Sequence, residues 1–507
     1  MKLNMRLAAR ISLAVSASWL CASSARAQYL GDVQEAKDHV GSALARGDFD
    51  GDGVQDLAIG VPDESVLAWS FPGGGTTYPG AGAVHVLYGV AGNGLTTAGT
   101  HFLRQGVTSA PNLGIGSYHA FGKALVAGDL NADAFDDLAI GIPGQTVNGF
   151  AKAGGVQVLL GSAQGLRVHE PIWWTQDSTG IADQAEAGDG FGSSLAVGDA
   201  DGDGFLDLAI GVPLEAVGSA AQAGGVHVLR GSPTGFAKSG HTWWTAQQLF
   251  LGPEVKAHFG FALAFGDFDA DGFDDLAIGA PESFRAQTYA GAVHVLRGSA
   301  SGPSGGGAQL WHQSVAGVAG IAEAYEQFGF ALAAADLDGD GFEDLAIGVP
   351  GDVVLGMSAG GVNALFGSAA GLAVTDNLLI SQADPFVIED PEEGDRFGAA
   401  LAILEFDGFA YLSIGVPGES VGKIQGAGAL ETVGIGARFV GYCHFFTGYP
   451  SEDRGFGSAA AMGDYNGDGY EDFAVGMPLL DSFVPDAGGV HVAYAYEPFP
   501  QQWVQAP

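Results

Sequence analysis

The feature that most constrains the fold is a unit that repeats along almost the whole chain. A Gly-Asp pair ending at Asp48 is followed by the apolar run Leu57–Val61 and, after a loop, by a second apolar run, Ala83–Leu87. The same order returns roughly every 70 residues. Seven units fill residues 39–507, the sixth being a degenerate copy around Glu405. This arrangement leaves no room for a second kind of domain.

Each unit contains the pattern of four short strands. In the third unit we expect strands over 193–198, 207–212 and 225–229 and around Trp243-Trp244, separated by Gly, Pro, Asp and Ser. No segment keeps a helical period. In the run Asp207–Val212, large residues alternate with Ala and Gly, as an inner strand packed on both faces requires.

The sequence therefore predicts an all-β fold, a seven-bladed β-propeller of four-stranded antiparallel blades. The blades are expected at residues 39–105, 119–177, 189–247, 257–313, 326–381, 395–447 and 454–505.

The order of motifs within a unit resembles a known family. Phe-Gly, then Asp-x-Asp-x-Asp-Gly-x-x-Asp-Leu-Ala-Ile-Gly-x-Pro, then Ala-Gly-x-Val is similar to the FG-GAP repeat. That repeat builds the propeller at the head of integrin α chains, and it occurs in secreted bacterial proteins and in a phospholipase that cleaves glycosyl-phosphatidylinositol anchors. The resemblance implies an integrin α-like propeller of the stand-alone, secreted bacterial type, without receptor signalling.

The loop after the first strand has the composition of a calcium site. In the first unit, Asp48, Asp50, Asp52 and Asp56 occupy loop positions 1, 3, 5 and 9, with Gly53 at position 6. Calcium takes six to eight oxygen ligands, and carboxylates at alternate positions of a curled chain can converge on one ion. Position 12 lies inside a strand, so the loop is not an EF-hand.

The other units repeat this set of ligands with graded quality. Four further loops are intact: Asp199, Asp201, Asp203, Asp207; Asp267, Asp269, Asp271, Asp275; Asp336, Asp338, Asp340, Asp344; and Asp464, Asn466, Asp468, Asp472. A weaker set is Asp129, Asn131, Asp133, Asp137, because Ala134 replaces the glycine and resists left-handed geometry. The sixth unit keeps only Glu405 and Asp407, so we expect no calcium there.

Arg46-Gly47-Asp48 is also the tripeptide that adhesion receptors recognise. Gly47 and Asp48 belong to the repeat, whereas the corresponding positions of the other intact units are apolar instead of Arg. Since Asp48 is expected on calcium, we interpret the tripeptide as a coincidence.

The first residues predict export. Lys2, Arg6 and Arg10 precede the apolar run Ile11–Ala22, and Ala25-Arg26-Ala27 is a cleavage signal, so residues 1–27 are expected to be a signal peptide. No other stretch is apolar enough to span a membrane, which predicts an extracellular or periplasmic protein. The formal net charge of −39 disfavours nucleic acid and anionic lipids as partners.

Three other signals are weaker. Gly418-Glu419-Ser420-Val421-Gly422 matches a nucleophile elbow, but no helix is expected after it. Histidines recur in the third strand at 85, 227, 294 and 491, and tryptophan pairs occur at 173–174 and 243–244. Because similar positions on different blades do not converge on one site, we expect these residues to pack in the blades.

Two questions of function and one of fold stay open. The first hypothesis is a secreted, calcium-stabilised binding or adhesion module for protein or carbohydrate. The alternatives are an extracellular hydrolase, phosphodiesterase or lyase on a propeller scaffold, and a structural part of an exported complex. The ligand is expected on the face opposite the calcium loops, where the longest loop, Pro62–Gly80, carries Asp63, Glu64, Trp69, Phe71 and Tyr78.

The ring can close through Gln501–Val504 or through Gln28–Leu30.

Overall fold

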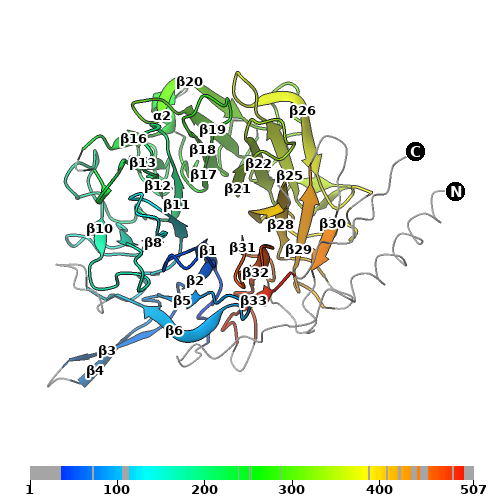
Figure 1. The fold of residues 1–507 in the computed structure, drawn as a ribbon. Helices are drawn as coiled ribbons and strands as arrows, with labels where there is room; N and C mark the ends of the chain where they lie inside the picture. Colours follow the sequence, from blue (N-terminus) through cyan, green and yellow to red (C-terminus); the bar gives the residue numbers. More distant parts are fainter. Residues whose placement is uncertain are drawn as a thin grey trace.

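The computed structural model shows sheets arranged in a ring around a central axis (Figure 1). It describes residues 36–495, apart from 71–73, 106–113, 238, 250, 251, 253, 286, 386, 388, 407, 408, 421–423, 436–441, 446–454 and 482–484. The expected signal peptide lies outside the described residues.

Seven antiparallel sheets form the blades, and within each one the strands follow in chain order from the axis outward. The first four blades consist of β1 (Ala43–Gly47), β2 (Asp56–Val61), β5 (Ala83–Tyr88) and β6 (Thr96–Leu103); β7 (Leu125–Gly128), β8 (Asp137–Gly141), β9 (Val156–Leu159) and β10 (Ile172–Trp174); β11 (Ser194–Gly198), β12 (Asp207–Val212), β13 (Gly225–Leu229) and β16 (Thr242–Trp244); β17 (Leu263–Gly266), β18 (Asp275–Ala280), β19 (Ala292–Arg297) and β20 (Ser304–Trp311).

The remaining blades consist of β21 (Leu332–Ala335), β22 (Asp344–Val349), β25 (Gly361–Phe366) and β26 (Ala373–Ile380); β27 (Ala400–Phe406), β28 (Phe409–Val416), β29 (Ala429–Gly434) and β30 (Tyr442–Phe445); β31 (Ala460–Gly463), β32 (Asp472–Gly476) and β33 (Val490–Ala493). Outside the blades are the hairpins β3 (Val66–Ser70) with β4 (Gly74–Tyr78), β14 (Gly231–Ser232) with β15 (Gly235–Phe236) and β23 (Val353–Val354) with β24 (Met357–Ser358), and the short helix α2 (Ala246–Leu249). The predicted all-β, seven-bladed propeller is confirmed.

Close contact between blades explains the repeated Phe-Gly pair and the glycine of the second strand. Phe259 is fully buried, and Gly260 has a φ of 87° that favours glycine. A Cβ on Gly211 in β12 would lie 2.1 Å from the carbonyl oxygen of Gly260 in the next blade. Neither glycine can therefore be enlarged without pushing two blades apart.

The ring closes with the same contact that joins the other blades. Gly224 of the third blade forms a parallel bridge with Phe259 of the fourth, and Gly488 of the seventh blade forms the equivalent bridge with Val40 at the start of the first. β1 also lies against β31. The fourth strand of the seventh blade, expected from Gln501–Val504 or Gln28–Leu30, falls outside the described residues.

The segment Pro62–Gly80, expected to be a loop, contains a hairpin instead. β3 and β4 pair from Val66–Tyr78 to Ser70–Gly74 and extend away from the ring (Figure 1). Val66, Thr76 and Thr77 favour extended backbone, which accounts for the difference. Among the described residues, no helix is long and apolar enough to cross a membrane.

Candidate metal sites

The first aspartate loop connects β1 to β2 on one face of the ring and is anchored by its last carboxylate. Asp56 is fully buried at the start of β2. Its Oδ2 accepts a hydrogen bond from the amide of Phe49 (2.9 Å) and its Oδ1 accepts one from the amide of Gly89 (2.8 Å). The loop is thus fixed to the turn that follows the third strand of its blade.

The first aspartate of the loop curls the chain around its own carboxylate. Asp48 Oδ1 accepts from the amides of Gly51 (2.8 Å) and Asp52 (3.1 Å), and Asp48 Oδ2 accepts from Gly53 (2.9 Å). Asp48, Asp50 and Asp56 each bring an oxygen within 4.8 Å of the others. Hard oxygen donors at this spacing fit a divalent cation.

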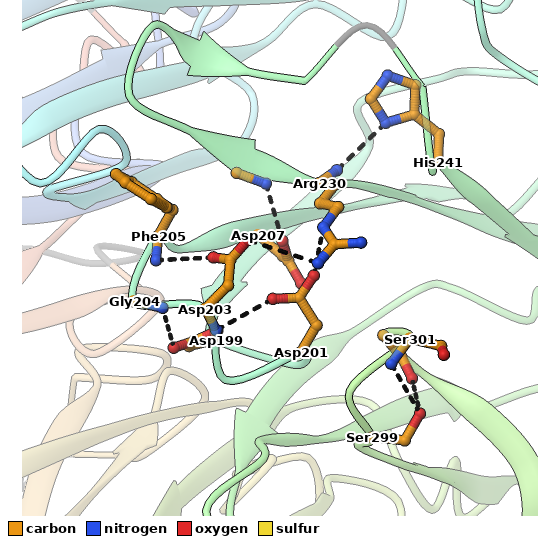
Figure 2. Close-up of polar contacts among 12 residues, drawn as sticks. Asp199, Asp201, Asp203, Gly204, Phe205, Asp207, Arg230, His241, Ser299 and Ser301 are labelled. Carbon is orange, nitrogen blue, oxygen red and sulfur yellow. Dashed lines mark hydrogen bonds and ion pairs between the residues drawn. The ribbon is translucent and has the colours of Figure 1, made fainter.

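The same geometry recurs around the ring. Figure 2 shows the third loop, where Asp199 accepts from the amides of Asp203 (3.1 Å) and Gly204 (2.9 Å). Three more groups of carboxylates converge within 4.8 Å: Asp199, Asp201, Asp203; Asp267, Asp269, Asp271; and Asp336, Asp338, Asp344. In the fourth loop, Asp269 Oδ1 is buried without a hydrogen-bond partner, as expected of an oxygen that serves as a cation ligand.

The two remaining loops keep the curled backbone. Asp129 Oδ2 accepts from the amide of Ala134 and Asp464 Oδ2 from that of Gly469, both at 2.8 Å. Ala134 adopts a φ of 70° at loop position 6, where the other aspartate loops have glycine, so this position carries strain that the other loops avoid there. Whether it binds an ion stays a prediction.

The sixth blade has a different connection. β27 and β28 remain paired up to Phe406 and Phe409, so only two residues separate the paired strands where the other blades have the aspartate loop. The expectation that this blade binds no calcium stays a prediction.

Burial makes the last aspartate of each loop hard to ionise without a counter-charge. It raises the pKa of Asp56 from 3.8 to about 8, with the neighbouring carboxylates of Asp50 and Asp48 adding to the shift. For the same main reason the pKa of the equivalent residue in the other loops rises to about 7: Asp137, Asp207, Asp275, Asp344 and Asp472. A bound divalent cation would stabilise these carboxylates in their charged form.

Sequence reasoning missed three arginines beside these loops, the first being Arg167, whose Nη2 is 3.8 Å from Asp133 Oδ2. Arg230 contacts Asp201 and lies 3.5 Å from Asp203 (Nη2 to Oδ2), as Figure 2 shows. Arg297 contacts Asp269 in the same way in the next blade. Arg230 directly follows the third strand of its blade, and Arg297 ends the third strand of the next. Each precedes Gly-Ser, a pattern that was visible in the sequence. Their guanidinium groups reduce the negative charge of the third and fourth loops.

The adhesion-like tripeptide is held within the ring. Arg46 lies in the innermost strand β1, and its Nη1 is 2.8 Å from Glu471 Oε1 of the seventh blade. Asp48 directs its oxygens at the amides of its own loop, as described above. This geometry supports the interpretation of the tripeptide as a coincidence.

The recurrent histidines pack separately, as expected. The ring of His227 stacks on Trp243 (4.1 Å between centroids) and lies near Phe191. Burial lowers the pKa of His227 and His294 to about 3, so both rings are neutral. In the nucleophile-elbow motif, Glu419 is buried and pairs with Gln382, while Val421 and Gly422 lie outside the described residues.

Comparison with known proteins identifies the repeat. The family model of the FG-GAP repeat matches six segments, in every blade except the sixth: residues 40–87, 121–159, 191–229, 259–296, 328–364 and 456–492. The chain is also similar to integrin alpha-PS2 of Drosophila melanogaster, at 34% identity over 236 residues, or 45% of this chain. It is similar to the phosphatidylinositol-glycan-specific phospholipase D of Homo sapiens, at 30% identity over 234 residues, again 45% of this chain.

These relatives are longer proteins. The chain spans only 15% of the integrin and 26% of the phospholipase. Among solved structures, the Dos1 propeller aligns over 86% of this chain and 89% of its own, at 10% identity and a TM-score of 0.44.

Proposed function

Because the chain is a propeller of FG-GAP repeats, similar to part of an integrin α chain, we propose that it is an exported binding module stabilised by calcium. The observation that carries the proposal is the set of aspartate loops on one face, whose buried last carboxylates need a counter-charge. Five intact loops bind calcium, and the loop of Asp129 binds it more weakly. Cleavage after Ala27 releases the propeller from its signal peptide.

The direct test is a thermal melt of the purified chain with calcium and with excess chelator. A ligand that binds only the folded state must raise the melting temperature as its free concentration rises. We expect a large increase with calcium and a smaller one with magnesium, because the loops offer more oxygens than octahedral magnesium accepts. Equal melting curves in calcium and chelator, with no ion detected by mass spectrometry, would sink the proposal.

The partner is proposed to be a protein or a glycan bound on the face opposite the aspartate loops. The second strand of each blade ends on that face, and the hairpin β3–β4 extends from the same connection. We expect the chain to be retained on members of an array of glycans and extracellular proteins. The variant W69A/Y78A should lose this retention while keeping its melting temperature; unchanged retention would exclude the hairpin.

A second candidate is an extracellular phosphodiesterase, favoured only by the similarity to phospholipase D. The third-strand histidines that could support such chemistry are packed in separate blades against aromatic rings. Hydrolysis of bis(p-nitrophenyl) phosphate by the purified chain, lost on adding chelator, would favour the enzyme over the binding module.

A further inference from the structure

A second set of buried acids lies between successive blades, on the face opposite the aspartate loops. We call each contact between two blades a seam and number it after the blade that precedes it. A seam cluster comprises a residue just after the outer strand of one blade and two residues of the next blade. Of these two, one lies two positions before Phe-Gly and the other follows the second strand.

In the second seam these three residues are Gln176, Asp189 and Glu215, all nearly fully buried. Gln176 Nε2 donates to Glu215 Oε2 (2.8 Å), and Asp189 Oδ2 accepts from the amide of Glu186 (2.5 Å). Oxygens of Glu186, Asp189 and Glu215 lie within 4.8 Å of one another. Glu186 is exposed, so the cluster is open to solvent at one side.

Two further seams repeat this arrangement. In the fifth seam Gln382 donates to Glu419 (2.6 Å), and Asp395 accepts from the amide of Glu392 (2.6 Å). In the fourth seam Gln313 donates to Asp352 (3.4 Å), beside the buried Glu326. Each of the three seams therefore places two buried carboxyl groups beside one glutamine.

The glutamine oxygen is the unexplained atom of all three seams. Oε1 of Gln176, Gln313 and Gln382 is buried and has no hydrogen-bond partner. Turning the amide around would bring this oxygen against a carboxylate, so the orientation is fixed by its neighbour. A buried carbonyl oxygen without a donor is costly, and a cation is one of the few groups that can satisfy it beside two acids.

The first seam shows the same cluster in a neutral form. His119 stands where the other seams have an acid, and its Nδ1 donates to Gln105 Oε1 (2.7 Å). Gln145 replaces the second acid and pairs with Gln105. Burial lowers the pKa of His119 to about 4, so this seam is uncharged and its glutamine oxygen is satisfied.

The third seam lacks the cluster, because Ala257 and Ser283 stand where the second seam has Asp189 and Glu215. Glu254 is 2.7 Å from Arg285 Nε, and its other oxygen accepts from Ser283 Oγ (2.7 Å). The first seam is thus neutral, and in the third the single acid Glu254, the counterpart of Glu186, already pairs with a guanidinium. In the second, fourth and fifth seams, no basic side chain of the described residues forms an ion pair with the clustered acids.

We propose that the second, fourth and fifth seams each bind a divalent cation between two blades, as a second set of metal sites. Its ligands are the paired carboxylates Asp189 with Glu215, Glu326 with Asp352, and Asp395 with Glu419, together with the oxygen of the adjoining glutamine. Two carboxylates match the charge of one divalent ion, and oxygen donors of this kind suit calcium. Exposed Glu186 and its counterpart Glu392 mark the side from which the ion enters.

The test counts calcium ions on the full chain by native mass spectrometry. We expect the variant D189N/E215Q, which keeps the shape of the second seam, to carry one ion fewer than the wild type. An unchanged count would overturn the proposal and would mean that the two carboxyl groups share a proton. If D189N/E215Q does not fold, Q176M, which removes only the amide group, should weaken calcium binding at this seam about tenfold; unchanged binding contradicts the proposal equally.

The neutral first seam provides the reciprocal experiment. The variant H119D/Q145E converts it into an acid seam, and we expect it to bind one additional ion; no additional ion in a folded variant counts against the ligand set. The proposal is also separable from the aspartate loops. The variant D199N/D203N should remove one ion from a loop and leave the seams unchanged. The ion count therefore tests the loop sites and the seam sites separately.

Discussion

The third and sixth blades differ in their aspartate loop but not in their architecture. Both have four antiparallel strands in the same order, and both begin with a fully buried phenylalanine, Phe191 or Phe397. Both also share a seam cluster of the same composition. Of these two blades, the third carries the aspartate loop and is matched by the FG-GAP family model, whereas the sixth has neither property.

This comparison separates the residues that position a blade from those that form an aspartate loop. A Cβ on Gly211 or on Gly415 would lie 2.1 or 2.0 Å from a carbonyl oxygen of the next blade. The amide of Asp199 donates to Asp274 Oδ2 (2.8 Å), and the amide of Glu405 donates likewise to Glu471 Oε2 (2.7 Å). The sixth blade therefore lacks the aspartates of the loop but keeps both of these contacts with the next blade.

The largest effect is expected from removing the phenylalanine of the Phe-Gly pair. Phe191→Ala and Phe397→Ala each leave a cavity at a blade interface and should cost about 3–5 kcal/mol of the free energy of unfolding. Urea denaturation in calcium measures both. Phe409→Ala, whose side chain is 59% exposed, is the control and should change stability by about 0.5 kcal/mol or less. A much smaller cost for Phe397 than for Phe191 would mean that the sixth blade is held differently.

The second-largest loss of stability is expected from the glycine contact between blades. Gly211→Ala and Gly415→Ala force a methyl group against a backbone oxygen that cannot move without separating two blades, at a cost of about 1–3 kcal/mol each. Gly252→Ala, where the added Cβ meets nothing within 4 Å, is the matched control. Tolerance of alanine at 211 or 415 would disprove the close approach.

Loss of metal should distinguish the two blades where the previous variants do not. Asp203→Asn removes a ligand from the third loop, so we expect a lower melting temperature in calcium and no change in chelator. Saturating calcium at about 100 times its Kd contributes about 2.7 kcal/mol per site, which sets the upper limit of the loss. Glu405→Gln in the sixth blade should leave both curves unchanged. A calcium-dependent shift in Glu405→Gln would reveal a site in the sixth blade.

The sequence was enough to predict the propeller and the aspartate loops, because both depend on residues that repeat at fixed local spacing. Asp48 to Asp56 is one continuous segment, and its four aspartates can be read directly. The hairpin β3–β4 escaped prediction because five-residue strands occur in this connection in one unit only; the fifth blade has just the two-residue strands β23 and β24 there.

The seam clusters could not be predicted for a different reason. Gln176 and Glu215 come from different blades, and the position of Asp189 is occupied by histidine in the first seam and by glutamate in the fourth. The positions are kept relative to Phe-Gly and to the second strand, but their identities are not, and the three residues lie far apart in the sequence. Only the folded ring shows that they meet.

A pH titration in chelator should affect both blades through their seam clusters. Burial raises the pKa of Glu215 from 4.5 to about 8 and that of Glu419 from 4.5 to about 9 in the folded chain. Stability from these groups is complete below the unfolded pKa of about 4.5 and is lost as pH rises through the folded pKa. We therefore expect the metal-free melting temperature to fall between pH 5 and pH 9.

The two blades can be told apart in this titration by single variants. Glu215→Gln should remove a fall that ends near pH 8, and Glu419→Gln a fall that continues to about pH 9. In saturating calcium the fall should be reduced, because the ion favours the charged carboxylates. A melting temperature that rises between pH 5 and pH 9 in chelator would contradict the assignment.

The smallest loss of stability is expected from removing Arg46, which shares Glu471 with the sixth blade. Glu471 accepts from the amide of Glu405 through one oxygen and from Arg46 through the other (2.8 Å). Arg46 is 41% exposed, so Arg46→Ala should cost less than about 1 kcal/mol of stability. The same variant tests the adhesion-like tripeptide, since binding to an integrin-bearing cell surface should be unaffected. Loss of cell binding without loss of stability would show that Arg46 acts outside the ring and that Asp48 is free of its loop.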